Sequence, residues 1–272
     1  MNKFYSVLSI LFLALSTASC AGNPVKKNMK FPTKAFVKVE YHAYEKICEP
    51  EDPDNMQSDC YKFSDGALGS GSIVGTSLTG SYILTAAHIC NKGEDVLKYD
   101  LFEEDGAPKV LIKKFYVYDI DEFKYNVEIL KYNDKHDICV AHVWGLFGKP
   151  IKIASRGPRI GEEAYNMAAP AGFSSRRMVP LFNGMYSGRY QHAAIYTIPA
   201  IGGSSGSPIL NENSELIGLV YARHIRFHHI ILSPRYKVLR KFILSSIKEH
   251  TEKVSREQGV PEERSIKIRF GK

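Results

Sequence analysis

A glycine- and serine-rich stretch, Ile201–Pro208, places Ser205 between two apolar runs of the chain. So much glycine beside β-rich sequence indicates a tight backbone turn that larger side chains would block. A serine on such a turn is exposed, and neighbouring backbone N–H groups can point at one spot beside it. Acyl transfer needs this arrangement, because fixed donors must meet the oxyanion as it develops. Taken alone, the stretch is equally compatible with a flexible Gly/Ser loop.

Two other stretches carry the side chains that would activate this serine. His88 follows the apolar and small residues 81–87, and Asp137 precedes the apolar run Ile138–Val143. An imidazole can take the serine proton during attack and return it to the leaving amine. A buried carboxylate fixes the imidazole tautomer and stabilises the imidazolium that forms. Asp134 competes with Asp137 for this role, and Asp137 is favoured because it leads directly into the core-forming run.

A basic segment, residues 223–229, follows the serine and contains three histidines and two arginines. Such a cluster raises the question of a metal site. No Cys, Asp or Glu ligands are spaced with the histidines, so a basic surface or pocket rim is the favoured interpretation, and neither a metal nor a cofactor is expected. If the segment lines a crevice, it would favour an acidic substrate side chain.

The bulk composition describes an ordinary globular protein. The 272 residues can bury a core as one large β domain or two small ones, and 44% hydrophobic with 24% charged residues excludes a disordered chain. Lys and Arg (36) exceed Asp and Glu (29), which gives a net charge of +7. These cations are scattered along the sequence, so nucleic-acid binding is not expected, and the charge supports a mild attraction to anionic surfaces or acidic substrates.

The N-terminal residues 1–19 have the pattern of a secretory signal peptide. Lys3 precedes an apolar run over 4–18 that is short for a membrane span and ends in small residues. The sequence up to Cys20 also resembles a bacterial lipoprotein cleavage box, although Thr17 stands where an aliphatic residue is usual. We expect export to the cell envelope, periplasm or medium, with Cys20 lipidated and anchored to a membrane. Ordinary cleavage with a free or buried Cys20 is the alternative.

Four other cysteines are then available for disulfides. Cys48 and Cys60 bracket an acidic, turn-rich segment that a bridge could close, and Cys90 and Cys139 would pair by default. Four cysteines allow three connectivities, so this pairing is a preference.

The remaining pattern predicts an all-β fold with one helix. Short strands separated by turn residues, with little helical periodicity, favour a barrel or sandwich. The glycine-rich residues 67–74 fit a strand that another backbone approaches closely. Tyr236–Glu249 has an apolar helical face, and Gly145–Ile160 is a composition break between two halves. The expected strands are 36–41, 67–74, 81–88, 96–102, 109–117, 127–132 and 137–143, then 164–168, 177–182, 188–190, 194–198, 209–210, 216–223 and 229–232.

Three motifs together resemble those of the chymotrypsin-like (trypsin-fold) serine proteases. They are Thr85-Ala86-Ala87-His88, His136-Asp137-Ile138 and Gly203-Ser204-Ser205-Gly206-Ser207-Pro208, in the chain order His, Asp, Ser. The third motif, with Asn211–Gly218, is most similar to the bacterial glutamyl endopeptidase branch. The resemblance covers roughly residues 34 to 235. It implies two six-stranded antiparallel β-barrels with the active site between them, and a C-terminal α-helix.

The resemblance also implies a role for each matching residue. His88 would be the general base, Asp137 its orienting carboxylate and Ser205 the nucleophile, with the backbone N–H groups of Gly203 and Ser205 as the oxyanion hole. The substrate backbone would pair with Tyr221, Ala222 and Arg223, and Pro199 would lie at the pocket floor.

Departures from the family pattern narrow these expectations. Ser204 stands just before the serine, where the family often has aspartate. Val220 stands where glutamyl endopeptidases carry a pocket histidine, so their glutamate specificity is not inherited. Pro199 is uncharged, which argues against a preference for Arg or Lys in the substrate. Ile89 separates His88 from Cys90, which disfavours the family's usual bridge. Cys90–Cys139 is favoured instead, because each cysteine lies two residues past a triad member.

The expected organisation is a signal peptide (1–19), a tether (20–33), an N-terminal barrel (34–148), a C-terminal barrel (149–233), a helix (234–250) and a charged tail (251–272). The expected function is that of an exported serine endopeptidase acting on polypeptide substrates. The alternative is a catalytically silent binding module with a protease fold at the cell envelope, and an esterase is disfavoured because the α/β-hydrolase motif order is absent.

Overall fold

The computed structural model describes residues 29–46, 61–91, 111–258 and 267–268. The signal peptide, Cys20, Cys48, Cys60 and the expected strand 96–102 lie outside these residues, so the predictions made for them stay predictions. The chain divides into two units, Met1–Lys30 and Phe31–Lys272. The description below concerns the second unit.

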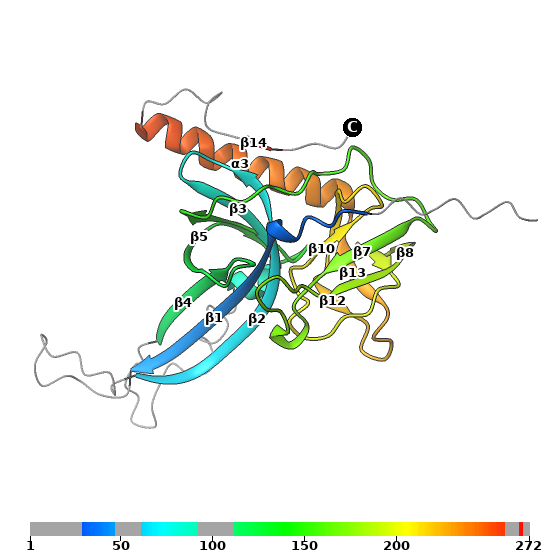
Figure 1. Cartoon of the computed structure of the whole chain (residues 1–272), viewed down its shortest axis with the longest axis horizontal. Coiled ribbons are helices and arrows are strands. Elements are labelled where there is room, and N and C mark those ends of the chain that lie inside the picture. Colours follow the sequence, from blue (N-terminus) through cyan, green and yellow to red (C-terminus); the bar gives the residue numbers. More distant parts are fainter. Residues whose placement is uncertain (1–28, 47–60, 92–110, 259–266, 269–272) are drawn as a thin grey trace, which may run out of the picture. The chain divides into compact units, whose positions relative to one another are not determined.

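Six antiparallel strands of the first half close into a barrel (Figure 1). Their order is β1-β4-β5-β6-β3-β2, and β2 pairs back onto β1. A two-residue strand, β14 (Lys267–Ile268), adds to the end of β2, and a short 3-10 helix, η1 (Thr33–Ala35), precedes β1. This closed barrel confirms the first of the two that were expected. Its strands are β1 (Phe36–Lys46), β2 (Tyr61–Thr76), β3 (Gly80–Thr85), β4 (Leu111–Tyr118), β5 (Lys124–Asn133) and β6 (Ile138–Trp144).

The long C-terminal helix α3 (Tyr236–Gln258) covers the outer face of part of this barrel. Strand β3 is buried at all six positions and β6 at its first six, although alternation would bury only one face of each strand. The second face of β6 is buried because α3 packs on β5, β6 and β11 (orange helix in Figure 1), and on β3 the Tyr82 hydroxyl contacts His250 and Thr251 of the same helix. The helix runs past its expected end at Glu249 because Thr251 is buried against Tyr82, whose hydroxyl lies 3.3 Å from Thr251 Oγ1. No helix among the described residues has the length and apolar character that a membrane crossing requires.

The second half forms an open seven-stranded sheet, with the order β11-β10-β7-β8-β9-β13-β12. The second closed six-stranded barrel was expected here and is not formed. Between β11 and β12 the chain changes partner: Val220 extends the pairing with β10, since its N–H donates to Ser207 O (2.9 Å) and its carbonyl accepts from the Gly206 N–H (2.7 Å), whereas the Tyr221 N–H donates to Leu232 O (3.1 Å) on β13. The strands are β7 (Glu163–Met167), β8 (Leu181–Tyr190), β9 (Ala193–Tyr196), β10 (Pro208–Leu210), β11 (Leu216–Leu219), β12 (Ala222–Arg223) and β13 (Ile231–Pro234), with a 3-10 helix, η3 (Pro170–Gly172), between β7 and β8.

Strand β8 is one continuous element where two shorter strands, 177–182 and 188–190, were expected. Asn183-Gly184 has the composition of a turn, which accounts for the expected break. In the structure Gly184 lies inside β8, and any Cβ there would overlap the carbonyl of Thr197 on the neighbouring segment. The glycine therefore serves the close approach of a neighbouring backbone rather than a turn.

Candidate active site

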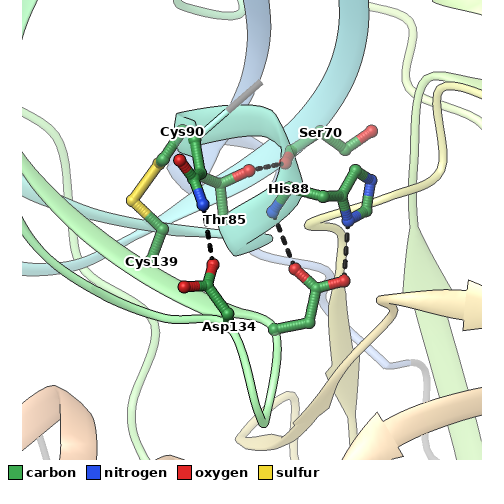
Figure 2. The surroundings of a disulfide bond; sticks show 8 residues. Ser70, Thr85, His88, Cys90, Asp134 and Cys139 are labelled. Atoms are coloured by element: carbon green, nitrogen blue, oxygen red, sulfur yellow. Dashed lines mark hydrogen bonds and ion pairs between the residues drawn. A yellow bond between two sulfur atoms is a disulfide. The ribbon is translucent and has the colours of Figure 1, made fainter. Parts of the chain in front are cut away.

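Asp137 holds His88 at two points, at the place where β3 ends and a helical turn over residues 87–91 begins (Figure 2). Its Oδ1 accepts the backbone N–H of His88 at 2.8 Å, and its Oδ2 lies 2.7 Å from His88 Nδ1. Since a carboxylate can only accept, His88 Nδ1 carries the proton and Nε2 is left as the basic nitrogen. The His88 side chain is 42% exposed and that of Asp137 is 19% exposed. The imidazole is thus fixed at one nitrogen and accessible.

The turn that presents Asp137 is built from local side-chain and backbone hydrogen bonds. The His136 N–H donates to Asn133 Oδ1 (3.0 Å), and the Asp137 N–H lies 3.3 Å from Asp134 O. Asp137 has φ +51°, a left-handed conformation that aspartate tolerates better than most residues. Asp134 instead accepts from Asn91 Nδ2 at 2.9 Å. Of the two candidate carboxylates, the structure therefore brings Asp137, and not Asp134, to the histidine.

A disulfide between Cys90 and Cys139 joins the segments that carry His88 and Asp137 (Figure 2). The Cα atoms lie 6.5 Å apart, within the usual range for a bridge. Cys139 is fully buried and Cys90 is 8% exposed. This confirms the pairing that was favoured from the sequence. The bridge covalently joins the segment that carries the imidazole to the segment that carries the carboxylate.

The loop with Ser205 packs directly against the residues that lead into His88. A Cβ on Gly206 would overlap Ser70 O and Thr85 Oγ1 and lie 3.0 Å from Ala86 N. Gly206 has φ +85°, so both its space and its backbone conformation exclude a larger residue. Ser205 itself is half-buried. Tertiary structure thus brings the serine loop and the histidine turn side by side.

Three backbone amides of this loop have no acceptor within the described part of the chain, those of Gly202, Gly203 and Ser205. Their neighbours do have acceptors: the Ser204 N–H donates to Ile201 O (3.0 Å) and the Ser207 N–H to Ser204 O (3.1 Å). Gly203 has φ +89°, a left-handed backbone conformation that residues with a side chain rarely adopt. The two amides expected to form the oxyanion hole are therefore among those left available to an external acceptor.

Ser70, on β2, is a residue of this site that the sequence analysis did not identify. Its side chain is fully buried, its Oγ donates to Gly203 O (2.8 Å) and accepts from the Ala169 N–H (2.9 Å), and its own N–H donates to Ser205 O (2.7 Å). The only sequence signal was the glycine-rich stretch 67–74, which predicted the close approach of another backbone. That prediction is confirmed, since a Cβ on Gly69 would lie 3.2 Å from Ser205 O.

A second unpredicted residue, Asn166, holds the serine loop from the side of β7. Its Nδ2 donates to Ser207 Oγ (2.7 Å) and to Pro208 O (3.0 Å), and Ser207 Oγ in turn donates to Ser204 O (2.6 Å). Asn166 and Ser207 are both fully buried. The loop is therefore clamped from both sheets, by Ser70 and by Asn166, and it is not a flexible Gly/Ser linker.

The residues expected to contact substrate lie at the edge of the second sheet. Ala222 and Arg223 form β12, the last strand in the sheet order, and pair only with β13. Tyr221 is half-buried, and burial together with the charge of Asp137 raises the pKa of its hydroxyl. Pro199 is half-buried beside Ala200, whose N–H donates to His228 O at 3.1 Å.

Among the described residues, no hydrogen bond joins the Ser205 hydroxyl to the His88 ring. Such bonds are often long or poorly aligned before substrate binds. Within the same residues, no group of three or more His, Cys, Asp or Glu side chains could hold a metal ion. The arrangement offers a fixed imidazole, a hydroxyl on the adjacent loop and two available amides, which are the parts that acyl transfer requires.

Comparisons with known proteins identify the family of the chain and a similar fold. Residues 69–219, more than half of the chain, match the trypsin-like peptidase domain. The solved structure of the serine endoprotease from Yersinia pestis is similar in fold, with a TM-score of 0.55 and 18% identity over 80% of this chain. The chain spans 65% of the length of that protein. No curated protein sequence matches.

Proposed function

Because the chain belongs to the trypsin-like peptidase family, we propose that it is a serine endopeptidase that hydrolyses peptide bonds through an acyl-enzyme. The observation that carries the proposal is the two-point hydrogen bonding of Asp137 to His88, in a turn against which the Ser205 loop packs. A buried structural histidine would not need a carboxylate on one nitrogen and solvent access at the other.

In the acylation step, Ser205 Oγ attacks the scissile carbonyl while His88 Nε2 takes the hydroxyl proton. The imidazolium that forms is stabilised by the Asp137 carboxylate, 2.7 Å from Nδ1. The carbonyl oxygen becomes an oxyanion and accepts from the N–H groups of Gly203 and Ser205. Fixed donors of this kind stabilise the transition state by about 3 kcal/mol each.

Collapse of the tetrahedral intermediate breaks the C–N bond and leaves an ester on Ser205. His88 returns its proton to the leaving amine, which departs as the new N-terminus. A water molecule then attacks the ester while His88 Nε2 takes its proton, and a second collapse releases the new C-terminal carboxylic acid and restores the Ser205 hydroxyl.

The substrate backbone pairs with β12. This strand lies at the edge of its sheet and keeps one side without a partner strand among the described residues. An extended peptide can add to such an edge through main-chain hydrogen bonds. Tyr221, Ala222 and Arg223 provide these contacts in the proposal.

The substrate side chain before the scissile bond is acidic in this proposal. Arg223 Nη1 donates to His228 Nδ1 at 2.9 Å, and the His228 carbonyl accepts from Ala200, on the segment that leads to Ser205. A guanidinium at this place favours a carboxylate. A peptide library in which Asp and Glu give no gain over Ala, or in which Arg223→Ala keeps the gain, would contradict this preference.

Labelling with a fluorophosphonate probe tests the activity itself. We expect the probe to modify Ser205, as located by mass spectrometry, and the label to be lost in Ser205→Ala. Ser204→Ala is the matched control, because it removes the adjacent hydroxyl and should keep the label. A folded wild-type protein that takes no label would instead favour the alternative, a catalytically silent binding module with a protease fold.

Export is part of the proposal and rests on the signal-like residues 1–19 and on the Cys90–Cys139 disulfide, which fits an oxidising compartment. Cys20 is proposed as a lipidation site. Metabolic labelling with palmitate that leaves the mature chain unlabelled would remove the anchor.

A further inference from the structure

A cavity of about 1010 Å³ lies along helix α3. One wall is the first three turns of the helix, and the other is formed by residues 155–158 and by strands β8 and β9. None of His88, Asp137 and Ser205 is among its lining residues. We call this cavity the α3 groove, and its position makes it separate from the candidate active site.

The rim of the α3 groove is strongly cationic. No Asp or Glu is found among the described residues that line it. Arg156 pairs with Glu162 outside the groove, at 2.7 Å, and Lys248 with Glu252, at 3.4 Å. The described residues contain no ion-pair partner for Arg189, Lys237 or Lys241. The lining cations are Arg156, Arg189, Arg235, Lys237, Arg240, Lys241 and Lys248.

The floor of the groove is apolar and aromatic. Tyr186, which is 7% exposed, lines it and packs on the fully buried Tyr196, with the two rings 5.2 Å apart. Leu244, which is half-buried, and Val238 add aliphatic surface from the helix. The cationic rim alone would suit any small anion. A ligand that matches both the rim and the apolar floor carries negative charges beside an apolar group.

The length of the groove distinguishes an extended ligand from a compact one. Lys237, Lys241, Leu244 and Lys248 follow one face of α3 at helical spacing. The span from Lys237 to Lys248 is about 16 Å at about 1.5 Å per residue, which is the length of roughly five extended peptide residues. A single phosphate or carboxylate would reach only one part of this row.

We propose that the α3 groove binds an extended acidic peptide segment, with carboxylates on the lysine row and an aliphatic or aromatic side chain on the Tyr186–Leu244 floor. Nothing in this binding requires Ser205, so the proposal goes beyond the peptidase activity.

The test uses a short fluorescein-labelled peptide in which glutamates alternate with leucines, titrated into the full chain with Ser205→Ala so that it stays intact. Fluorescence anisotropy should show saturable binding that weakens as salt rises, because the Debye length shortens. Lys237→Glu combined with Lys241→Glu should weaken binding at least about tenfold, since each reversal turns an attraction into a repulsion. Lys253→Glu, on the same helix outside the groove, should change it by less than about twofold.

A second variant tests the apolar floor. Leu244→Ala should weaken the glutamate–leucine peptide and leave a glutamate–glycine peptide unchanged. Melting temperatures of all variants establish that they fold. The proposal is overturned by absent or non-saturable binding, by an equal effect of Lys253→Glu, or by vesicles of anionic lipid that bind through Lys237 and Lys241 while the peptide does not. These results do not depend on whether the chain is catalytically active, because the serine is removed throughout.

Discussion

Replacing Asp137 with asparagine tests the two-point contact on which the proposed mechanism depends. The two carboxylate oxygens accept from the His88 backbone N–H at 2.8 Å and from Nδ1 at 2.7 Å. Asparagine has the same shape and tolerates the φ of +51°, but it has only one oxygen. If that oxygen keeps the backbone contact, an amide NH₂ faces Nδ1, and Nδ1 must become an acceptor. The proton then moves to Nε2, the atom that has to receive the serine proton.

The expected loss of kcat/KM in Asp137→Asn is about 10⁴-fold, the size seen when this substitution produces the wrong tautomer in a Ser-His-Asp triad. That factor corresponds to about 5 kcal/mol of transition-state stabilisation. The loss of folding stability should be below about 3 kcal/mol, the upper range for one hydrogen bond to a charged group. Activity and stability are therefore affected to very different degrees.

The assay compares hydrolysis of fluorescently labelled casein with urea unfolding for the same preparations. Asp134→Asn is the matched control, because Asp134 bonds to Asn91 rather than to His88, and its activity should stay within about twofold of wild type. The reasoning is refuted if Asp137→Asn keeps activity within tenfold of wild type, or if Asp134→Asn loses as much.

Three other predictions concern stability. Burial, with a smaller contribution from the charge of His250, lowers the pKa of His142 from 6.5 to about 4, so the unfolded chain binds more protons than the folded chain between these two pH values. The free energy of unfolding should therefore fall by about 3 kcal/mol as the pH drops through this window. In His142→Phe, urea unfolding should show a weaker dependence of this free energy on pH. Gly206→Ala should destabilise the fold and abolish fluorophosphonate labelling, because its Cβ would overlap Ser70 O at a φ of +85°; a labelled, stable variant would contradict the packing. Cys90→Ser with Cys139→Ser should cost about 2–4 kcal/mol, since the bridge closes a loop with a sequence separation of 49; unchanged urea midpoints would show that this constraint is negligible.

The sequence was most informative where chemistry is local. Glycines around Ser205 predicted a tight loop, small residues before His88 predicted a turn at a strand end, and the strand after Asp137 predicted its position at a core boundary. Each feature follows from steric and polar preferences within a few residues of the chain. The beginning of the helix was predictable for the same reason, whereas the first barrel was implied by the family resemblance.

The sequence was least informative where distant segments compete for the same backbone groups. Residues 216–223, expected as one strand, form β11 and β12 because the chain changes partner between them, from β10 at Val220 to β13 at Tyr221. Ser70 has no distinctive local pattern, yet it joins the first barrel to the serine loop. Gly184 could be assigned to a turn or to a close contact only once Thr197 was known to lie against it.

By itself, the sequence determined the chemistry that we propose, because the types of the three side chains and the turns that present them are encoded locally. Tertiary structure alone decided which carboxylate reaches His88, which amides of the loop remain available, and how scattered cations at positions 156, 189 and 235–248 gather around one groove. These outcomes depend on contacts between segments far apart in the chain, and local propensities carry no information about such contacts.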